Sequence, residues 1–349
     1  MQFDKIPVGI LGATGAVGQK LIALLAGHPW FEVCEVVASD RGVGQEYGAY
    51  VSWHEAQVIP DRVTKLRLKS CKEPLNSRLL FSGLTAEVAG PVEAAYAAAG
   101  HIVVSNAKNH RLEDKVPLII PEINSEHLEL ITPETRKKGY IVTNPNCVVV
   151  MLALALAPIY RHFGLERVMV STMQAISGAG YPGVASLDII GNVLPHIIGE
   201  EEKIAPETKK ILGELKNNAV KFADFKLSAS CNRVPVREGH LLNVALQCGR
   251  RVTRAEMIAA WREFGSQKLA LPSAPREVVR FIDQPLRPQP SLDLMAGNGM
   301  TVTIGNLRAC EVLDWKFAVF GHNTIRGAAG AAILNAEALV AAGWLGERR

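Results

Sequence analysis

Residues 143–147 place two asparagines and a proline directly before a cysteine, and an apolar run at 148–158 follows at once. Asparagine is a favoured N-cap and proline suits the first turn, so the run predicts a buried helix that begins here. A cysteine at a helix N-terminus lies at the positive end of the helix dipole, which favours its thiolate. Cys147 is therefore a candidate nucleophile. The alternative is a small buried residue that starts a core helix, which is the commoner role of cysteine.

A glycine-rich turn near the start of the chain predicts a nucleotide site. An apolar stretch at 5–11 precedes Gly12-Ala-Thr-Gly-Ala-Val-Gly18, and helical spacing follows at 19–26. A turn of this kind lets the backbone approach a pyrophosphate, which then lies at the helix N-terminus. The spacing is G-x-x-G-x-x-G instead of the usual G-x-G-x-x-G, and a tight turn without a ligand is the alternative. The expected cofactor contacts are Gly12, Thr14, Gly15, Ala16 and Val17.

The residues after the second predicted strand indicate which dinucleotide is bound. That strand, at 31–38, ends in Ser39-Asp40-Arg41-Gly42. Folds specific for NAD usually place an acidic residue here for the ribose hydroxyls, whereas a nearby arginine accommodates a 2′-phosphate. Ser39 and Arg41 suit a phosphate, and Asp40 argues the other way unless its side chain points elsewhere. The segment favours NADP.

The composition is typical of a globular enzyme. The chain has 349 residues, enough for two domains, and 48% of them are hydrophobic and 21% charged, so a large core is expected. A net charge of +4 gives no case for a nucleic-acid surface. The six cysteines have no C-x-x-C spacing, which argues against a zinc cluster or redox pair, and no metal site is expected.

The N-terminal residues argue against secretion, and the length of the apolar runs argues against membrane insertion. Met-Gln-Phe-Asp-Lys is followed directly by a predicted core strand, which leaves no room for a signal peptide. The longest apolar run, at 148–158, is too short to cross a bilayer. The expectation is a cytoplasmic protein without a membrane partner.

Strand and helix patterns alternate up to about residue 145 and change in character afterwards. Predicted strands at 79–81, 101–105 and 139–143, with an Ala-rich helix at 87–99, argue for a doubly wound, Rossmann-type parallel sheet in an α/β domain. The later strands predict an α+β domain with a mixed or antiparallel sheet and hairpins. They are expected at 167–172, 226–236, 241–249, 278–281 and 300–308.

The C-terminal segment bears on the domain boundaries. Residues 323–345 are Ala-rich and helical, long enough to pack back on the first domain. We therefore expect one domain at 1–145, completed by a C-terminal helix at 323–349, and a second domain at 146–322.

Motifs in a fixed order connect these segments to a known family. With them the chain resembles the aspartate-β-semialdehyde dehydrogenases over nearly its whole length, and most closely their archaeal and fungal branch. The motifs are Gly12-Ala-Thr-Gly-Ala-Val-Gly18, Ala38-Ser-Asp-Arg41, Ser105-Asn-Ala-Lys108, Asn144-Pro-Asn-Cys147, Gln174-Ala-Ile-Ser-Gly-Ala-Gly180, Arg233-Val-Pro-Val-Arg-Glu-Gly-His240 and Gly321-His-Asn-Thr324.

The resemblance implies a reaction. Members of this family reduce L-aspartyl 4-phosphate with NADPH to L-aspartate 4-semialdehyde and phosphate, on the route to lysine, methionine, threonine and bacterial diaminopimelate. It also implies that the first domain binds NADP, that the second is catalytic and dimerising, and that the chain forms a homodimer or homotetramer.

The resemblance assigns the covalent chemistry to two residues. Cys147 matches the nucleophile that would form a thioester, which divides one difficult transfer into two easier ones. His240 matches the acid/base histidine; a lone histidine opening a strand would otherwise more often be structural. A hairpin centred between Val236 and Arg237 would place Arg233 and His240 opposite each other on a strand pair.

Substrate contacts follow by the same resemblance. Arg233 matches the arginine that binds the substrate carboxylate, for which a planar fork is suited. Glu200 and Lys203 match an E-x-x-K pair for the α-amino group and the phosphate, although 200–203 also suits an ordinary solvated helix start, and which of the three glutamates matters stays open. Asn146 and Gln174 would orient the acyl group or stabilise the oxyanion.

The phosphate pocket and the 2′-phosphate site depart from the bacterial pattern. Lys108 stands where the fungal members have their lysine, and Arg111 is the second candidate for the phosphate. Gly42 replaces a serine that many relatives place next to the 2′-phosphate. The remaining expected cofactor contacts are Ser82, Gly178 and Asn323.

Other functions on related folds remain as alternatives. N-acetyl-glutamyl-phosphate reductases share the glycine turn and an Asn-Pro-x-Cys motif, but the spacing of Arg233 and His240 argues against them. A malonyl-CoA reductase would use the same cysteine and histidine. Glyceraldehyde-phosphate dehydrogenases place their cysteine in a Ser- and Thr-rich motif, absent here. A nucleotide-binding scaffold without activity would not need Cys147, His240 and Arg233 together.

Overall fold

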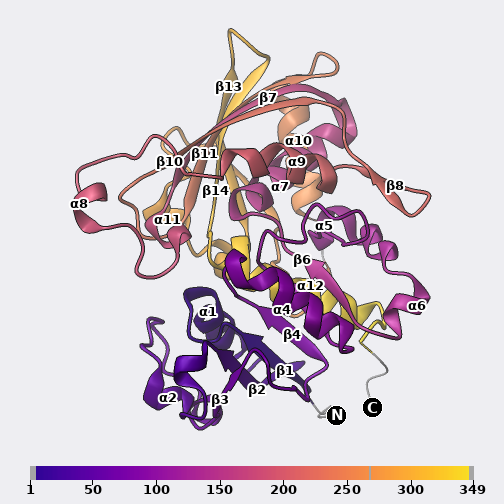
Figure 1. Ribbon diagram of the computed structural model, residues 1–349. Coiled ribbons are helices and arrows are strands. Elements are labelled where there is room, and N and C mark those ends of the chain that lie inside the picture. Colours follow the sequence, from indigo (N-terminus) through magenta and orange to yellow (C-terminus); the bar gives the residue numbers. More distant parts are fainter. Residues whose placement is uncertain (1–4, 267–268, 346–349) are drawn as a thin grey trace. The chain divides into compact units, whose positions relative to one another are not determined.

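The computed structural model describes residues 5–266 and 269–345, which fall into two compact units (Figure 1). Within the described residues, the first unit takes in 5–119, 126–144 and 329–345, and the second takes in 120–125, 145–266 and 269–328. The chain therefore leaves the first unit before Cys147 and returns to it with its last helix.

The first unit is built on a six-stranded parallel sheet in the order β3-β2-β1-β4-β5-β6. This is the strand order of a doubly wound dinucleotide-binding fold, so the predicted Rossmann-type sheet is confirmed. β4 and β5 are buried at every residue, as strands covered on both faces must be. The strands are β1 (Ile6–Leu11), β2 (Phe31–Ala38), β3 (Leu68–Ser70), β4 (Leu79–Ser82), β5 (Ile102–Ser105) and β6 (Tyr140–Thr143).

Helices of the first unit begin at the carboxyl ends of these strands. α1 (Ala16–Leu25) follows β1, and α4 (Ala86–Ala98) follows β4. α12 (Gly330–Ala341) comes from the far end of the chain and packs against β5 and α1. The short helices are η1 (Asp40–Gly42), α2 (Tyr47–Tyr50), α3 (Asp61–Thr64), η2 (Ser125–Leu130) and α6 (Pro133–Arg136).

The second unit contains a mixed six-stranded sheet in the order β10-β7-β11-β14-β13-β12. β7 lies between β10, to which it is parallel, and β11, to which it is antiparallel. The predicted second sheet is confirmed, with β14 as a strand that the sequence pattern did not indicate. Its strands are β7 (Leu165–Gln174), β10 (Lys226–Arg233), β11 (His240–Cys248), β12 (Val279–Ile282), β13 (Val302–Ala309) and β14 (Trp315–Gly321).

The helix that Cys147 begins is the centre of the second unit. α7 (Cys147–Phe163) is buried at every position from Val148 to Ile159, and it packs against β7, β11, β13 and β14. α9 (Glu201–Ile211) and α10 (Arg254–Gly265) pack against α7 in turn. The shorter elements are α5 (Pro121–Asn124), η3 (Ile176–Ala179), α8 (Ser186–Ile189), β8 (Glu214–Lys216), β9 (Ala219–Lys221), α11 (Pro290–Asp293), η4 (Ala296–Gly299) and the π-helix η5 (Ile325–Ala329).

The predicted hairpin between Arg233 and His240 is wrong. β10 and β11 are not neighbours, because β7 lies between them. The connection at 234–239 passes across the end of β7, where Ile176 N–H donates to Val236 O over 2.8 Å. β7 pairs in parallel with β10 on one side and antiparallel with β11 on the other, which leaves no place for a direct hairpin. A hairpin does occur between β13 and β14.

Among the residues that the structure describes, no helix is both long and apolar enough to cross a bilayer.

Candidate active site

Asn146 caps α7 and is itself held by Glu200, the N-cap of α9, and by Glu207 within that helix. Its side-chain Oδ1 accepts from the backbone N–H groups of Val148 (2.9 Å) and Val149 (3.4 Å). Its Nδ2 donates to Glu200 Oε1 over 2.8 Å, and its backbone N–H donates to Glu207 Oε2 over 2.7 Å. The N–H groups of Val148 and Val149 already donate to this cap. The sulfur of Cys147 therefore lies at the positive end of the α7 dipole, and its stabilisation comes from the dipole and not from these two N–H groups.

Three predicted residues meet at one edge of the second sheet. Gln174 ends β7, and Arg233 is paired with it at the end of β10. His240 begins β11 on the other side of β7, beside the register pair of Leu241 and Met173. Gln174 therefore stands between Arg233 and His240, with its Nε2 donating to Thr172 Oγ1 over 3.3 Å.

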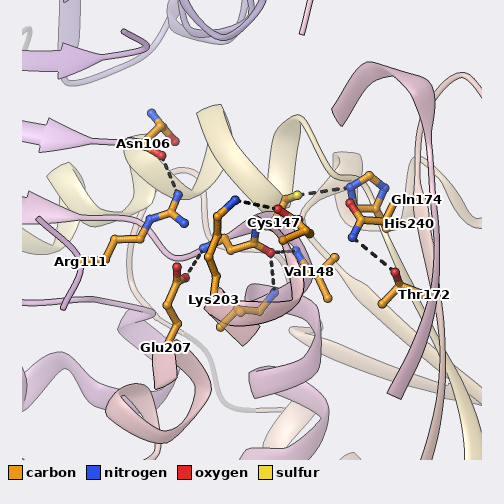
Figure 2. A network of polar contacts seen from close by, with 12 residues as sticks. Asn106, Arg111, Cys147, Val148, Thr172, Gln174, Lys203, Glu207 and His240 are labelled. Carbon is orange, nitrogen blue, oxygen red and sulfur yellow. Dashed lines mark hydrogen bonds and ion pairs between the residues drawn. The ribbon is translucent and has the colours of Figure 1, made fainter. Parts of the chain in front are cut away.

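The sulfur of Cys147 lies 3.2 Å from Nε2 of His240 (Figure 2). The backbone N–H of Ala175 donates to Nδ1 of the same ring over 3.0 Å. Since Nδ1 accepts this bond, a neutral imidazole carries its proton on Nε2 and directs it at the sulfur. The pair is therefore arranged for a hydrogen bond from imidazole to thiolate.

His240 is fully buried beside a guanidinium. Burial, together with the positive charge of Arg233, lowers the pKa of His240 to about 3, while Glu200 partly opposes this shift. The ring is accordingly neutral at neutral pH. A neutral donor next to the sulfur can stabilise a thiolate or an oxyanion without adding a full charge to the site.

Arg233 is 6% exposed, and burial lowers the pKa of its guanidinium while the charges of Cys147 and Glu200 oppose that change. Arginine remains charged even so. Within the described residues the guanidinium makes one hydrogen bond, from Nη1 to Ala175 O over 2.9 Å. Because the group has five N–H donors, most of the fork is available for an anionic ligand.

Two glycines let backbone approach these side chains closely. A Cβ on Gly178 would lie 2.7 Å from Nη1 of Arg233 and 3.2 Å from Cε1 of His240. A Cβ on Gly327 would lie 2.7 Å from the Cβ of Cys147. Gly327 belongs to the π-helix η5, an irregularity that often marks functional sites. Any side chain at either position would displace the groups that meet at the sulfur.

The three glutamates at the start of α9 have different surroundings. Glu200 is buried and accepts from Lys203 Nζ (2.9 Å) as well as from Asn146. Burial alone would raise the pKa of Glu200, but the Lys203 ammonium and these hydrogen bonds lower it below its usual value. Glu201 accepts from the backbone N–H of Cys231, and Glu202 is exposed. Glu200 is thus the glutamate connected to the nucleophile helix.

The glycine turn of the first unit has the form that a pyrophosphate requires. Gly12 has a φ of +74°, and a Cβ on Gly18 would lie 2.2 Å from the carbonyl oxygen of Gly12. Gly15 is the N-cap of α1 and has no side chain to occupy the first N–H groups of the helix. Gln19 Nε2 donates to Thr14 O over 2.9 Å and holds the turn in place. These residues, with Ala16 and Val17 in the first turn, fit a bound dinucleotide.

In the segment after β2, the side chain of Arg41 is exposed, whereas that of Asp40 has a hydrogen-bond partner. Asp40 Oδ1 accepts from Ser70 Oγ over 2.9 Å, so this carboxylate has a partner on β3. Ser39 is the exposed N-cap of η1. Gly42 is buried, and a Cβ there would lie 2.7 Å from the ring of Tyr50. A side chain at this position would therefore have to displace the Tyr50 ring.

The two phosphate candidates lie in one loop of the first unit but differ in exposure. Lys108 is exposed, whereas Arg111 is 7% exposed and donates from Nη2 to Asn106 O over 2.6 Å (Figure 2). Ser82 is fully buried at the end of β4. In the second unit, Asn323 uses its side chain to bind Gly239 N–H and Ser177 Oγ, each over 2.8 Å.

The structure thus gathers one set of predicted residues in the second unit and another in the first. The set in the second unit consists of Cys147, Asn146, Gln174, Arg233, His240, Glu200 and Lys203. The set in the first unit consists of the glycine turn, Ser39, Arg41, Ser82 and the loop of Lys108. Sequence reasoning missed Glu207 and Gly327. Glu207 could have been found, because it lies two helical turns after Glu200 and hence on the same face of α9. Among the described residues no group of three or more His, Cys, Asp or Glu could hold a metal ion.

Comparison with known proteins identifies relatives of both parts of the chain. Residues 7–131 match the NAD binding domain of the semialdehyde dehydrogenases, and residues 156–326 match their dimerisation domain. The aspartate-semialdehyde dehydrogenase of Archaeoglobus fulgidus is 46% identical, over 96% of this chain and 98% of its own. That of Aspergillus fumigatus is 43% identical, over 98% of this chain and 99% of its own.

Among solved structures, the aspartate-semialdehyde dehydrogenase of Candida albicans with NADP superposes with a TM-score of 0.90 at 38% identity. It covers 98% of this chain and all (100%) of its own. The resemblance to archaeal and fungal members is therefore confirmed at the level of sequence and fold. The chain belongs to the aspartate-semialdehyde dehydrogenase family.

Proposed function

We propose that the chain reduces L-aspartyl 4-phosphate to L-aspartate 4-semialdehyde with NADPH and releases phosphate, on the route to lysine, methionine, threonine and diaminopimelate. The observation that carries the proposal is the contact of 3.2 Å between Cys147 Sγ and His240 Nε2, with Arg233 beside it. A sulfur nucleophile, a neutral N–H donor and a buried cation suit an acidic acyl phosphate.

In the first step Cys147 attacks the acyl carbon of the mixed anhydride. The carbon–sulfur bond forms and the bond to the phosphate oxygen breaks, so phosphate leaves with the electron pair and a thioester remains. Asn146 and Gln174 orient the acyl group and stabilise the oxyanion of the tetrahedral stage. Their side chains come from a helix cap and a strand end, which gives them fixed positions.

Bound NADPH would supply the hydride that reduces the acyl carbon of this thioester. The resulting oxyanion collapses to the aldehyde and expels the sulfur as thiolate. As the sulfur regains its negative charge, the N–H of His240 donates to it. A neutral imidazole with a low pKa can fill this role. In the reverse direction the thiolate adds to the aldehyde carbon, and the same N–H stabilises the charges that form there.

Charged groups around the sulfur select the substrate. Arg233 binds the substrate carboxylate through the fork that remains available. Glu200 binds the α-ammonium group, and Lys203 assists with the phosphate. Lys108 is the principal phosphate residue, since it is exposed while Arg111 is buried and donates to a backbone carbonyl. Arg111 then serves the phosphate indirectly.

The cofactor is assigned to the first domain, with boundaries 1–145 and 323–349. The pyrophosphate would lie on the turn of Gly12, Thr14, Gly15, Ala16 and Val17. Ser39 and Arg41 would bind the 2′-phosphate, a role supported by the engagement of Asp40 with Ser70. Ser82, Gly178 and Asn323 complete the cofactor contacts, and the domain at 146–322 provides catalysis and dimerisation.

We further propose a homodimer or homotetramer in the cytoplasm. On β7 the exposed residues Arg167, Met169 and Ser171 alternate with buried ones, so one face of the second sheet is open in the single chain. Met169 is 56% exposed. An apolar side chain on an open sheet face supports burial against a second copy.

The test is an assay with L-aspartate 4-semialdehyde, phosphate and NADP. The proposed enzyme forms NADPH from this mixture and none when phosphate is omitted. Oxidation of NADPH by malonyl-CoA or by N-acetyl-glutamyl phosphate, with no reaction of the semialdehyde, would instead establish one of the alternative reductases. Binding of NADP without turnover of any of these substrates would establish a nucleotide-binding scaffold.

A further inference from the structure

A buried carboxylate in the first unit has no role in the chemistry described above. Glu93 lies on α4 and is 0% exposed. A carboxylate removed from water is costly unless hydrogen bonds and opposite charges compensate for its lost hydration. Its contacts therefore indicate what it is there to hold.

Glu93 is surrounded by hydroxyl groups at the carboxyl ends of two strands. Ser105 Oγ, at the end of β5, donates to Glu93 Oε1 over 2.8 Å. Burial raises the pKa of Glu93, and hydrogen bonds from Ser82 and Ser105 oppose that effect, followed by the charges of His110 and Arg111. The carboxylate thus joins α4 to β4, to β5 and to the loop that follows β5.

His110 provides the contact with that loop. Its Nε2 lies 3.7 Å from Glu93 Oε2, and neither atom has a hydrogen-bond partner among the described residues. Nδ1 of the same ring is 2.7 Å from Glu113 Oε1. The imidazole is therefore held between two carboxylates, one buried and one at the surface.

The loop at 106–113 is attached to α4 at a second point. Asn109 Nδ2 donates to the carbonyl oxygen of Ala86 over 2.9 Å, and Gly90 allows this approach, since a Cβ there would lie 3.0 Å from Nδ2. The start of the loop is fixed through Ser105, whose Oγ also accepts from the backbone N–H of Ala107 over 3.1 Å. Lys108 lies between these anchors, with Ala107 before it and Asn109 after it.

We propose that Glu93 is a positioning residue: through Ser105 and His110 it fixes the loop at 106–113 on α4 and so places Lys108 for the phosphate of the substrate. This inference rests on the proposed function, in which Lys108 binds that phosphate. A carboxylate suits the task better than an amide, because both of its oxygens carry negative charge: Oε1 accepts from Ser105, and Oε2 faces the imidazole of His110 at ion-pair distance.

The test uses Glu93→Gln in the full-length protein, assayed with semialdehyde, phosphate and NADP varied separately. The amide places an NH₂ against either Ser105 or His110, so the loop loosens. The Michaelis constant for phosphate is expected to rise on the order of 10-fold, since a displaced binding group costs this much or more. The constant for semialdehyde should change less than about 2-fold.

Glu337→Gln is the matched control. Glu337 is also a fully buried carboxylate of the first unit that faces a histidine, with His28 Nε2 2.8 Å away, but it lies on α12. It should lower the melting temperature as much as Glu93→Gln and leave the Michaelis constant for phosphate unchanged. Equal effects of both variants on that constant would reduce Glu93 to a stability residue and overturn the inference.

A double-mutant cycle with Lys108→Ala tests the route through the lysine. Once Lys108 is removed, Glu93→Gln should add little to the Michaelis constant for phosphate. Fully additive effects would overturn the inference while leaving the proposed function intact. Should Lys108→Ala itself leave that constant unchanged, Lys108 is not the phosphate residue and the inference fails with that assignment.

Hydrogen exchange gives a readout independent of activity. Peptides covering 106–113 should exchange faster in Glu93→Gln and in His110→Asn than in the wild type, whereas peptides of the second unit should not change. His110→Asn also serves if Glu93→Gln does not fold. Unchanged exchange in this loop would overturn the inference even if the wild type proved to have another substrate.

Discussion

The backbone N–H of Asn146 donates to the carboxylate of Glu207 over 2.7 Å, one residue before the sulfur that opens α7. A glutamate in the middle of α9 thereby fixes the residue that caps the nucleophile helix. The position of Cys147 depends on this bond as well as on the helix itself.

Truncation of Glu207 should affect both stability and turnover. Glu207→Ala leaves the buried N–H of Asn146 without this acceptor, which costs roughly 1–3 kcal/mol in the free energy of unfolding. We expect kcat to fall as well, because the cap moves relative to the sulfur. Denaturant titration and steady-state kinetics check this, with the exposed Glu202→Ala as a control expected within about 0.5 kcal/mol of wild type. A loss of stability with kcat unchanged would separate Glu207 from the nucleophile.

Replacement of the nucleophile should abolish turnover and spare cofactor binding. Cys147→Ala removes the group that forms the thioester, and Cys147→Ser leaves at most a trace, because a hydroxyl without a strong base is a poor nucleophile. Fluorescence titration with NADP should give nearly the same dissociation constant for both variants and the wild type. Near-native activity in either variant would rule out the covalent mechanism.

Arg41 should distinguish the two nicotinamide cofactors. Arg41→Ala removes a cation that only the 2′-phosphate of NADPH requires, so its Michaelis constant should rise much more than that of NADH. Asp40→Asn is a useful companion, because Asp40 is bound to Ser70 and should affect both cofactors little. Equal changes with NADPH and NADH in Arg41→Ala would exclude Arg41 from the 2′-phosphate site.

Arg233 and His240 should give defects of different kinds. Arg233→Lys keeps the charge but loses the planar fork, so we expect weaker substrate binding and a lower kcat/KM. His240→Asn keeps a polar side chain but loses the imidazole beside the sulfur, a loss on the order of 10²–10⁴-fold in kcat with KM much less affected. Kinetics at several pH values would measure both. A raised KM with unchanged kcat in His240→Asn would make His240 a binding residue.

The low pKa of His240 predicts a pH dependence of stability. The folded protein holds this ring neutral down to about pH 3, whereas the ring of the unfolded chain takes up a proton as the pH falls below about 6.5. The unfolded state therefore binds more protons in this window. As the pH is lowered through it, this group reduces the free energy of unfolding by at most about 1.4 kcal/mol per pH unit. Urea titrations between pH 7 and pH 4 should show a smaller decline in His240→Asn. The same decline in both proteins would contradict the assignment.

Local signals in the sequence were enough to predict several helices, strands and turns of this protein. The Asn-Pro-Asn cap before an apolar run predicted a helix beginning at Cys147, and α7 begins there. The strand, glycine turn and helix at Gly12 were predicted correctly for the same reason. Caps, turns and hydrophobic periodicity depend on residues close in sequence, so they are visible before the chain is folded.

Only the tertiary structure decided which side chains meet. Arg233 and His240 are separated by β7, because β10 pairs in parallel with a strand more than fifty residues earlier in the chain. Glu207 reaches Asn146 from another helix, and Glu93 joins two strand ends to a loop. Such contacts follow from strand order and helix packing, which arise from many weak, distant interactions and leave no short pattern in the sequence.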